Sequence, residues 1–408
     1  MAEFKWTDAQ RDAIEARGDI LVSAAAGSGK TAVLVQRVME MMESECDIDE
    51  LLIVTFTRSA AQQMKEKIAQ AIDKRLAQDP YDEHFRRQQI LLEKAQITTI
   101  DAFCADVLKN NYQLLKDIDI SPAYQNLDAA QFSVLSREVL DEVLDEFYER
   151  NEPSFKALMD LFTSGKNDLN IYAIIDSLHA YTSAFVDKHA WIHEKINLYT
   201  ENQVAQNPWG KLILCAMEEN LVLATDYARH ALDILAEDAP TDEVYGEVLR
   251  TDLALYESVL SYVRAGAWDK LCAYKDYSFV RYPSVKKNID TELSALAKPY
   301  RNAAKDAFSA AMKKVVEDEA GFAKDNALIY PVACELERLF ECYEQKLFET
   351  KLERRSFEFS DISDLTLKIL VDENGQPTPA AIEYQKKYKG ILIDEFQDTN
   401  DEIGRAHV

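Results

Sequence analysis

The feature that most constrains this 408-residue sequence is a glycine-rich segment, Ala24-Ala25-Ala26-Gly27-Ser28-Gly29-Lys30-Thr31. An apolar run over 18–24 precedes it, and apolar residues at helical spacing follow over 31–42. A glycine-rich turn between a strand and a helix lets backbone N–H groups surround a phosphate, and the positive end of the helix adds to the attraction. In such a P-loop Lys30 reaches the β- and γ-phosphates, and the Thr31 hydroxyl ligates Mg²⁺. The eight residues therefore predict a site for ATP and Mg²⁺.

The elements predicted around this segment are typical of an α/β domain. Leu51-Leu52-Ile53-Val54 lacks polar alternation, as expected of a parallel strand that is buried on both faces. Helices are predicted over 59–76 and 101–112, with a third strand over 96–100 between them. Strands that alternate with helices in this way predict a parallel sheet with right-handed crossovers.

A long helical stretch interrupts this pattern. From about 105 to 355 the sequence reads as helix after helix, and a strand pattern returns only at Gly390-Ile391-Leu392-Ile393. We therefore expect an α/β domain over 1–112 and 351–408, split by a large all-helical insertion over 113–350. The resumed strand would complete the parallel sheet.

Two carboxylates, Asp394 and Glu395, follow the last predicted strand directly. An acidic residue at a strand tip can hold Mg²⁺, and a second carboxylate beside it can orient and deprotonate the attacking water. We assign Asp394 to the metal and Glu395 to the general base. Together with Lys30 these residues favour nucleotide hydrolysis; a small-molecule kinase would not need the segment Glu395-Phe396-Gln397-Asp398.

Charge and composition exclude several classes of protein. The net charge of −26 excludes a binder of nucleic acid whose whole surface is basic. No apolar stretch approaches the ~18 residues of a membrane helix, and the N-terminus has no secretory pattern. The six cysteines are far apart and form no CxxC pair, which argues against a zinc or iron–sulfur site. We expect a cytoplasmic protein that makes no contact with a membrane.

Several further strings carry a resemblance to a known family. They are Trp6-Thr7-Asp8-Ala9-Gln10, Thr55-Phe56-Thr57-Arg58-Ser59-Ala60-Ala61, Thr99-Ile100-Asp101-Ala102-Phe103-Cys104, Phe357-Glu358-Phe359-Ser360-Asp361 and Asp394-Glu395-Phe396-Gln397-Asp398-Thr399-Asn400. With the P-loop, they resemble superfamily 1 helicases of the UvrD/Rep type, and more narrowly the AddA family of bacterial ATP-dependent helicase-nucleases. The resemblance implies a RecA-like fold for the α/β domain.

The resemblance also implies roles for individual residues. Gln10 would read the adenine edge, although Thr7 and Gln10 also have the spacing of a helix capping box, and both roles are compatible. Gln397 would join the catalytic residues. The residues implied to face single-stranded DNA are Thr55, Phe56, Thr57, Arg58 and Thr99. Asp101 stands where the family commonly has His, and we exclude it from these contacts because a carboxylate repels phosphate.

One basic stretch stands out within the acidic insertion. Between Tyr274 and Lys314 there are nine Lys or Arg residues and four Asp or Glu residues, interleaved with Tyr277, Phe279 and Tyr282. Such a run can hold a phosphate backbone and stack on bases, with Lys286 and Lys287 as the candidate contacts. The alternative is a helical hairpin with a solvated basic face. The two interpretations have equal weight on the sequence alone.

The family implies an ATP-driven 3′-to-5′ DNA translocase that unwinds duplex ends in double-strand break repair, carries a C-terminal nuclease domain and pairs with a second, AddB-like subunit. We expect the natural gene to be longer than this chain, because Glu402 to Val408 also read as the translation of a sequencing adapter. In the family, a second RecA-like domain that would follow this segment carries arginine fingers, which raise the hydrolysis rate by about 10³–10⁵ in related enzymes. A chain without that domain would bind ATP·Mg better than it hydrolyses it. The competing interpretations are a UvrD-like helicase without nuclease and a non-catalytic nucleotide-binding module.

Overall fold

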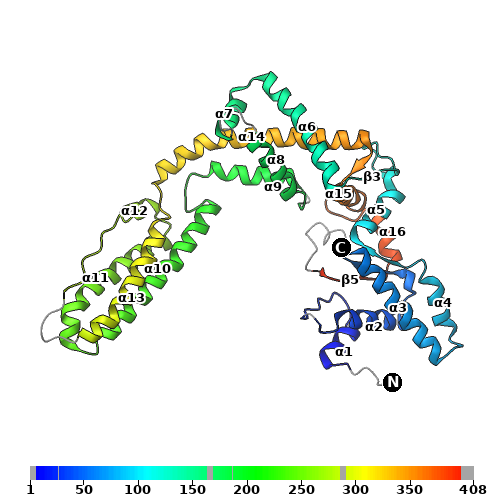
Figure 1. Cartoon of the computed structure of the whole chain (residues 1–408), viewed down its shortest axis with the longest axis horizontal. Coiled ribbons are helices and arrows are strands. Elements are labelled where there is room, and N and C mark those ends of the chain that lie inside the picture. Colours follow the sequence, from blue (N-terminus) through cyan, green and yellow to red (C-terminus); the bar gives the residue numbers. More distant parts are fainter. Residues whose placement is uncertain (1–5, 26, 163–168, 186, 285–290, 397–408) are drawn as a thin grey trace. The chain divides into compact units, whose positions relative to one another are not determined.

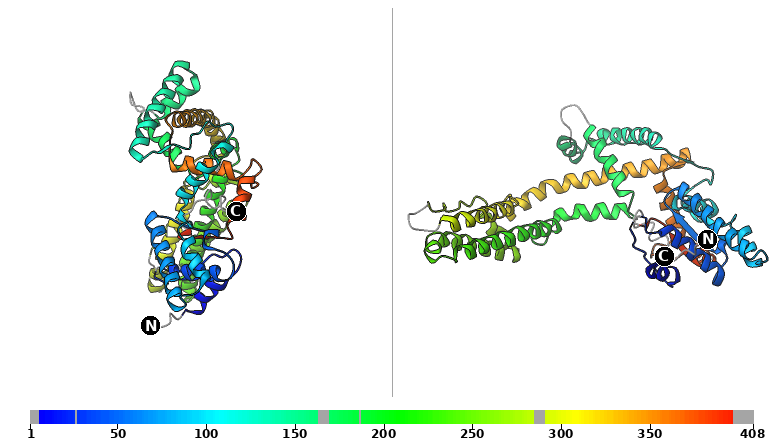
Figure 2. Two further views of the ribbon diagram at one scale, coloured as in Figure 1. Left: turned by 90° about the vertical axis from the view of Figure 1, so that its right-hand side faces the viewer. Right: turned by 60° about the horizontal axis from the view of Figure 1, so that its bottom comes forward.

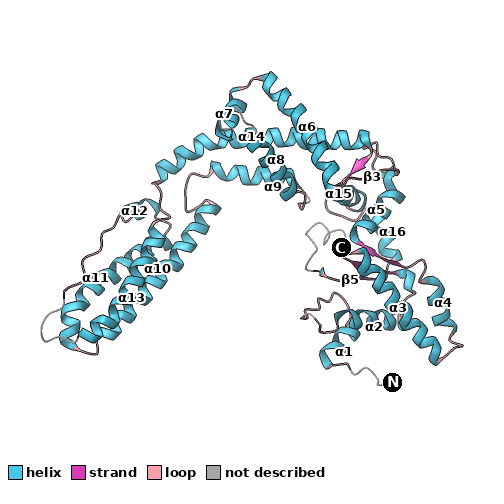
Figure 3. Cartoon of the chain, viewed as in Figure 1, coloured by secondary structure: helices cyan, strands magenta, loops and turns pink. Residues whose placement is uncertain are grey.

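The structure, a computed structural model, describes residues 6–25, 27–162, 169–185, 187–284 and 291–396 (Figure 1). These residues form two compact units. Unit 1 comprises the described residues within Met1–Glu146, Asn167–Lys188 and Glu341–Val408, and unit 2 those within Phe147–Lys166 and His189–Phe340. Helices predominate in both units (Figure 3). Within the described ranges, no helix combines the length and apolar content that a bilayer crossing requires.

Unit 1 contains a parallel sheet of three strands in the order β2-β1-β5. The strands are β1 (Leu51–Thr55), β2 (Gln96–Thr99) and β5 (Gly390–Ile393). Ile53 lies opposite Ile97 on one side and Leu392 on the other, and both pairings are parallel. The predicted parallel arrangement is confirmed, and so is the return of a strand at 390–393.

Helices cover both faces of this sheet. On one face, Leu51 and Ile53 pack with α2 (Lys30–Ser44) and α3 (Arg58–Gln78). On the other, Leu52 and Val54 pack with α5 (Ile100–Asn111) and α15 (Phe359–Leu370). All five residues of β1 are buried, which explains why its sequence shows no polar alternation. Three further helices complete the α/β part: α1 (Asp8–Glu15), α4 (Glu83–Leu91) and α16 (Pro379–Lys387).

The strand predicted over 18–24 does not form in the structure. These residues are irregular, and the apolar side chains of Ile20, Leu21 and Val22 are exposed. An apolar run becomes a strand only where a neighbouring strand supplies backbone hydrogen bonds. Within the described residues, β5 forms the edge of the sheet and pairs only with β1. The P-loop segment therefore follows an irregular segment rather than a strand.

The helical stretch leaves and rejoins the α/β part at one place. There, β3 (Gln125–Asn126) pairs in parallel with β4 (Ser356–Phe357), although some 230 residues separate them in sequence. Unit 1 also includes α8 (Leu169–Thr182) and parts of α6 (Ala129–Arg150) and α14 (Glu319–Arg354), so its limits differ from the breaks expected near 112 and 350.

All the regular secondary structure in the described part of unit 2 is helical. Its helices are α7 (Pro153–Phe162), α10 (Pro208–Leu235), α11 (Ala239–Arg264), α12 (Trp268–Cys272) and α13 (Thr291–Met312), with most of α9 (Lys188–Asn197) and the first part of α14. The long helices α10 and α13 lie side by side (Figure 2). Their facing sides supply a core that includes Met217, Leu221 and Phe308.

Candidate functional site

The glycine-rich segment shapes the start of α2 as a phosphate site requires. Gly27 and Gly29 have φ angles of 77° and 86°, a left-handed conformation that glycine adopts without strain. Helix α2 begins at Lys30, and no side chain caps its first turn. In contrast, threonine side chains cap α1, α3 and α5. The first N–H groups of α2 thus remain available for an anion.

Most of the segment is accessible. Ala25, Gly27 and Ser28 are exposed, while Ala24, Gly29, Lys30 and Thr31 are partly buried. A Cβ atom added at Gly27 would meet nothing within 4 Å, so the space above the loop is open. Ala26 lies outside the described residues. The arrangement fits a phosphate group, and the eight residues remain candidates for binding one.

The end of β5 brings a carboxylate close to the P-loop lysine. The Glu395 Oε2 atom lies 4.0 Å from the Lys30 Nζ atom. Glu395 has a φ angle of 55°, an unusual conformation for a residue other than glycine and one that often marks functional sites. The Asp394 backbone N–H donates to the Val54 carbonyl at 2.9 Å, which fixes the acidic pair to the sheet edge. Gln397 lies outside the described residues.

Gln10 combines the capping role with a second contact. Its Oε1 atom accepts from the Thr7 backbone N–H at 3.0 Å, and the Thr7 hydroxyl accepts from the Gln10 N–H. Its Nε2 atom donates to the Ser28 carbonyl at 2.9 Å, which braces the P-loop. An amide has two lone pairs and two donors, so one of each remains for an adenine edge.

Replacing Gln10 with Ala is expected to lower the free energy of unfolding by about 1 kcal/mol through the lost cap. The same change removes the brace on Ser28, so we also expect weaker binding of a fluorescent ATP analogue. Gln10→Glu is the matched control, because it keeps the capping acceptor but cannot donate to the Ser28 carbonyl. If the Glu variant binds nucleotide as the natural chain does, the brace has no role in binding.

The threonines predicted to face DNA are engaged with the backbone. Thr55 is 1% exposed, and its hydroxyl donates to the Thr57 carbonyl at 3.1 Å. The Thr57 and Thr99 hydroxyls accept from N–H groups in the first turns of α3 and α5, at 3.1 and 3.2 Å. The structure does not place Thr55 at the surface, so it positions the turn rather than offering a free hydroxyl. Phe56, in contrast, is 63% exposed.

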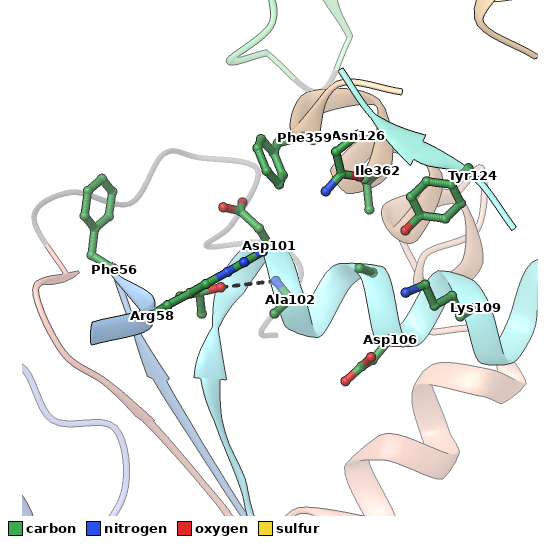
Figure 4. Close-up of a pocket in the computed structure, with 12 residues that line it drawn as sticks. Phe56, Arg58, Asp101, Ala102, Asp106, Lys109, Tyr124, Asn126, Phe359 and Ile362 are labelled. Carbon is green, nitrogen blue, oxygen red and sulfur yellow. Dashed lines mark hydrogen bonds between the residues drawn. The ribbon is translucent and has the colours of Figure 1, made fainter. Parts of the chain in front are cut away.

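A cavity of about 600 Å³ lies at the carboxyl ends of strands β1 and β2 (Figure 4). It brings together three of the predicted residues, Phe56, Arg58 and Thr99. It also includes residues that the sequence did not assign to a site: Asp101, Lys109, Tyr124, Asn126 and Phe359. Phe359 lies in a string already singled out by resemblance, but no local pattern identifies Lys109, Tyr124 or Asn126.

Asp101 lies in the cavity although its charge argued against a DNA contact. Partial burial raises the pKa of its carboxyl group above the ordinary value, and the nearby Arg58 guanidinium opposes that change. Figure 4 shows the Asp101 carboxyl group on the cavity side of α5. The cavity thus combines positive, negative and aromatic side chains, a mixture that suits a nucleotide unit better than a bare phosphate.

The aromatic residues of the basic stretch are partly buried and pack against the core of unit 2. The rings of Tyr277 and Phe279 pack against Phe308, with ring centroids 6.1 and 5.4 Å away. Tyr282 stacks on Tyr245 at 5.1 Å. These rings are therefore partly used in the packing of unit 2, which favours a structural role for them over stacking on bases.

One of the basic residues in that stretch is also structural. Arg301 is 3% exposed and forms an ion pair with Asp252 at 2.7 Å. It also donates to the Val280 carbonyl at 2.7 Å. These contacts give Arg301 a structural role, and residues 277–284 are irregular, so the described part of the stretch is not a helical hairpin with a solvated basic face. Lys286 and Lys287 lie outside the described residues.

Comparisons with known proteins show the family of this chain. The UvrD/REP helicase N-terminal domain family matches residues 6–403. The A subunit of an ATP-dependent helicase/nuclease from Listeria monocytogenes serotype 4b (strain F2365) is 35% identical over 97% of this chain and 32% of its own length. The proteins of the same name from Bacillus cytotoxicus and Geobacillus kaustophilus (strain HTA426) are 33% and 34% identical, over 97% and 98% of this chain and 33% of each relative. The chain spans about a third of the length of these relatives. It belongs to the UvrD/REP helicase family, with a match to the N-terminal domain over nearly its whole length.

Proposed function

We propose that the chain is the ATP-binding part of a helicase-nuclease subunit, in which ATP hydrolysis drives 3′-to-5′ movement on single-stranded DNA and unwinds DNA ends during double-strand break repair. The supporting observation is the hydrogen bond from Asp394 to Val54, at 2.9 Å. It joins the tip of the strand that carries the acidic pair to the strand that leads into Phe56 and Arg58. A change at the nucleotide would therefore reach the DNA-facing turn through one hydrogen-bonded pair of strands.

In this proposal each residue of the nucleotide site has a role. Lys30 and the N–H groups of α2 hold the phosphates, while Thr31 and Asp394 would hold Mg²⁺, which supplies charge neutralisation when bound. Glu395 accepts a proton from the attacking water. The uncapped α2 and the open space above Gly27 fit a bound phosphate. Gln397 and Ala26 complete the proposed set from the sequence.

The remaining parts of the proposal concern architecture and partners. Residues 1–112 and 351–408 form a RecA-like domain, and 113–350 form the helical insertion; the pairing of β3 with β4 supports this because it joins the two ends of the insertion. Phe56, Arg58 and Thr99 lie at the DNA-facing edge. Because the relatives are named as one subunit of a helicase/nuclease, we propose that the full-length protein assembles with a second, AddB-like subunit.

Nucleotide binding tests the first half of the proposal. Lys30→Ala is expected to weaken binding of a fluorescent ATP analogue with Mg²⁺ by roughly 10- to 150-fold, since a hydrogen bond to a charged group is lost. Lys74→Ala is the matched control, because Lys74 is exposed on α3 and remote from the P-loop in sequence. Equal affinities for the two variants would remove the P-loop from the site.

Coupling to DNA tests the second half. A single-stranded oligonucleotide should change the affinity of the chain for ATP or its rate of hydrolysis, and the nucleotide should change the affinity for DNA by the same thermodynamic factor. Arg58→Ala should weaken that coupling. Nucleotide binding that no oligonucleotide affects would contradict a motor and support the non-catalytic module instead.

A further inference from the structure

The cavity at the end of the sheet has polar groups on opposite sides. Asp101 comes from the first turn of α5 and Asn126 from β3, and Figure 4 shows both side chains at the same hollow. The rings of Tyr124 and Phe359 border it, and Ala102 contributes a small side chain on α5. A flat, polar-edged ring would find both stacking surfaces and hydrogen-bonding groups here.

The volume of the cavity and a buried hydroxyl group without a hydrogen-bond partner among the described residues both indicate a ligand. About 600 Å³ lies within the range of cavities that hold small organic molecules and is large enough for one nucleotide. The Tyr124 hydroxyl is buried and has no hydrogen-bond partner within the described part of the chain. Buried polar groups are nearly always paired, so a polar atom of a ligand beside Tyr124 would satisfy it.

The cationic and anionic side chains of the cavity suit different parts of a nucleotide. Arg58 and Lys109 are cationic and suit the phosphates that flank a nucleotide. Asp101 repels phosphate but can accept hydrogen bonds from a base. An ionised carboxylate has no donor, so it pairs only with donor groups. Cytosine, adenine and guanine each have an exocyclic amino donor, whereas the one base-edge donor of thymine, N3–H, lies between two carbonyl oxygens that repel a carboxylate.

We propose that this cavity holds one unstacked base of the single strand, and that Asp101, with Asn126, selects bases that carry an exocyclic amino group over thymine. The inference rests on the proposed function, because it requires single-stranded DNA at this edge of the sheet. Asp101 is then a specificity-determining residue. Although its carboxylate repels phosphate, Asp101 attracts the amino group at the edge of a base.

Binding of two pyrimidine homopolymers tests the proposal. Labelled oligo(dC) and oligo(dT) of about 15 nucleotides would be compared by fluorescence anisotropy at slightly alkaline pH. The natural chain should bind oligo(dC) at least about fivefold more tightly. Asp101→Asn should reduce the ratio to below about twofold, mainly by tighter binding of oligo(dT), because an amide can also donate to a carbonyl.

Two further variants separate the effects of charge and of general DNA binding. Asp119→Asn removes the same charge from an exposed residue that does not line the cavity, so it should keep the preference. Arg58→Ala should weaken binding of both oligonucleotides equally. A natural chain that binds both without preference, or an Asp101→Asn variant that keeps the preference, would overturn this inference alone. Failure to bind either oligonucleotide would overturn both the inference and the proposed DNA-binding function.

Discussion

Replacing Lys351 with Ala is expected to lower the free energy of unfolding by about 3–5 kcal/mol, because it takes the paired ammonium group from the partly buried Asp361 and leaves Glu358 with His179 alone. Lys351 is 1% exposed, and its Nζ atom lies 2.7 Å from Glu358 and 2.8 Å from Asp361. Burial alone would lower the pKa of Lys351, but the two carboxylates outweigh it and the pKa is raised. Glu358 and Asp361 also form the capping box of α15, so the loss would loosen the helix that covers the sheet.

Urea unfolding of three variants would measure this effect and identify its cause. Lys346→Ala is the control on the same helix: its ion pair with Glu142, at 3.5 Å, is exposed and should contribute less than about 1 kcal/mol. Lys351→Met keeps most of the apolar stem but removes the charge, and should be nearly as unstable as Lys351→Ala. If Met restores the stability, packing rather than charge explains the loss.

Two strands of the sheet could be predicted from the sequence because each is a short apolar run, although only β1 is buried along its whole length. Leu51 to Val54 and Gly390 to Ile393 are short continuous apolar runs, and the structure has strands at both places. The conformation of the P-loop could also be predicted, because the left-handed φ angles observed at Gly27 and Gly29 are ones that glycine adopts without strain. These features depend on local sequence, which is why local patterns identified them.

The predictions that the structure does not support concern residues whose environment depends on parts of the chain that are distant in sequence. Leu21 lies in an apolar run of the sequence, but no strand among the described residues pairs with that run. Its side chain is therefore exposed. Tyr277 and Phe279 lie in an irregular segment, yet their rings pack against Phe308 of α13. The cavity lining joins Tyr124 to Phe359, which lie more than 200 residues apart. No period or spacing within one segment reports such contacts.

Stability should also depend on pH through His179, which is buried in unit 1. Its Nδ1 and Nε2 atoms lie 2.5 Å from Glu344 and 3.2 Å from Glu358, and its ring stacks on Phe132. Burial alone would lower the pKa of His179, but the two carboxylates raise it to about 9. A raised pKa means that the folded chain holds the proton more tightly than the unfolded chain. The stabilisation is therefore complete below about pH 6.5 and is lost as the pH rises through about 9.

Glu344 gives the opposite dependence at acid pH. Burial would raise its pKa, but hydrogen bonding and attraction from His179 and charge from Lys188 lower it to about 2. A lowered pKa stabilises the fold above the ordinary pKa of 4.5, and this contribution disappears as the pH falls toward 2. The pKa of Asp364, raised to about 6 by burial, places its titration below the alkaline range in which His179 acts. His179 and Glu344 together predict greatest stability between about pH 4.5 and 6.5, and Asp364, whose raised pKa favours the folded state at lower pH, shifts the maximum toward the acid end of that range.

Urea unfolding at intervals from pH 5 to 9.5 would test this dependence. The natural chain should lose stability, by a few kcal/mol at most, between about pH 6.5 and 9. His179→Gln should be less stable at pH 6 and should show little further loss above it, because its amide does not titrate. His84→Gln alters an exposed histidine of the same unit and should keep the alkaline loss. An unchanged alkaline loss in His179→Gln would show that another group causes it, and that the proton shared among His179, Glu344 and Glu358 does not stabilise the fold.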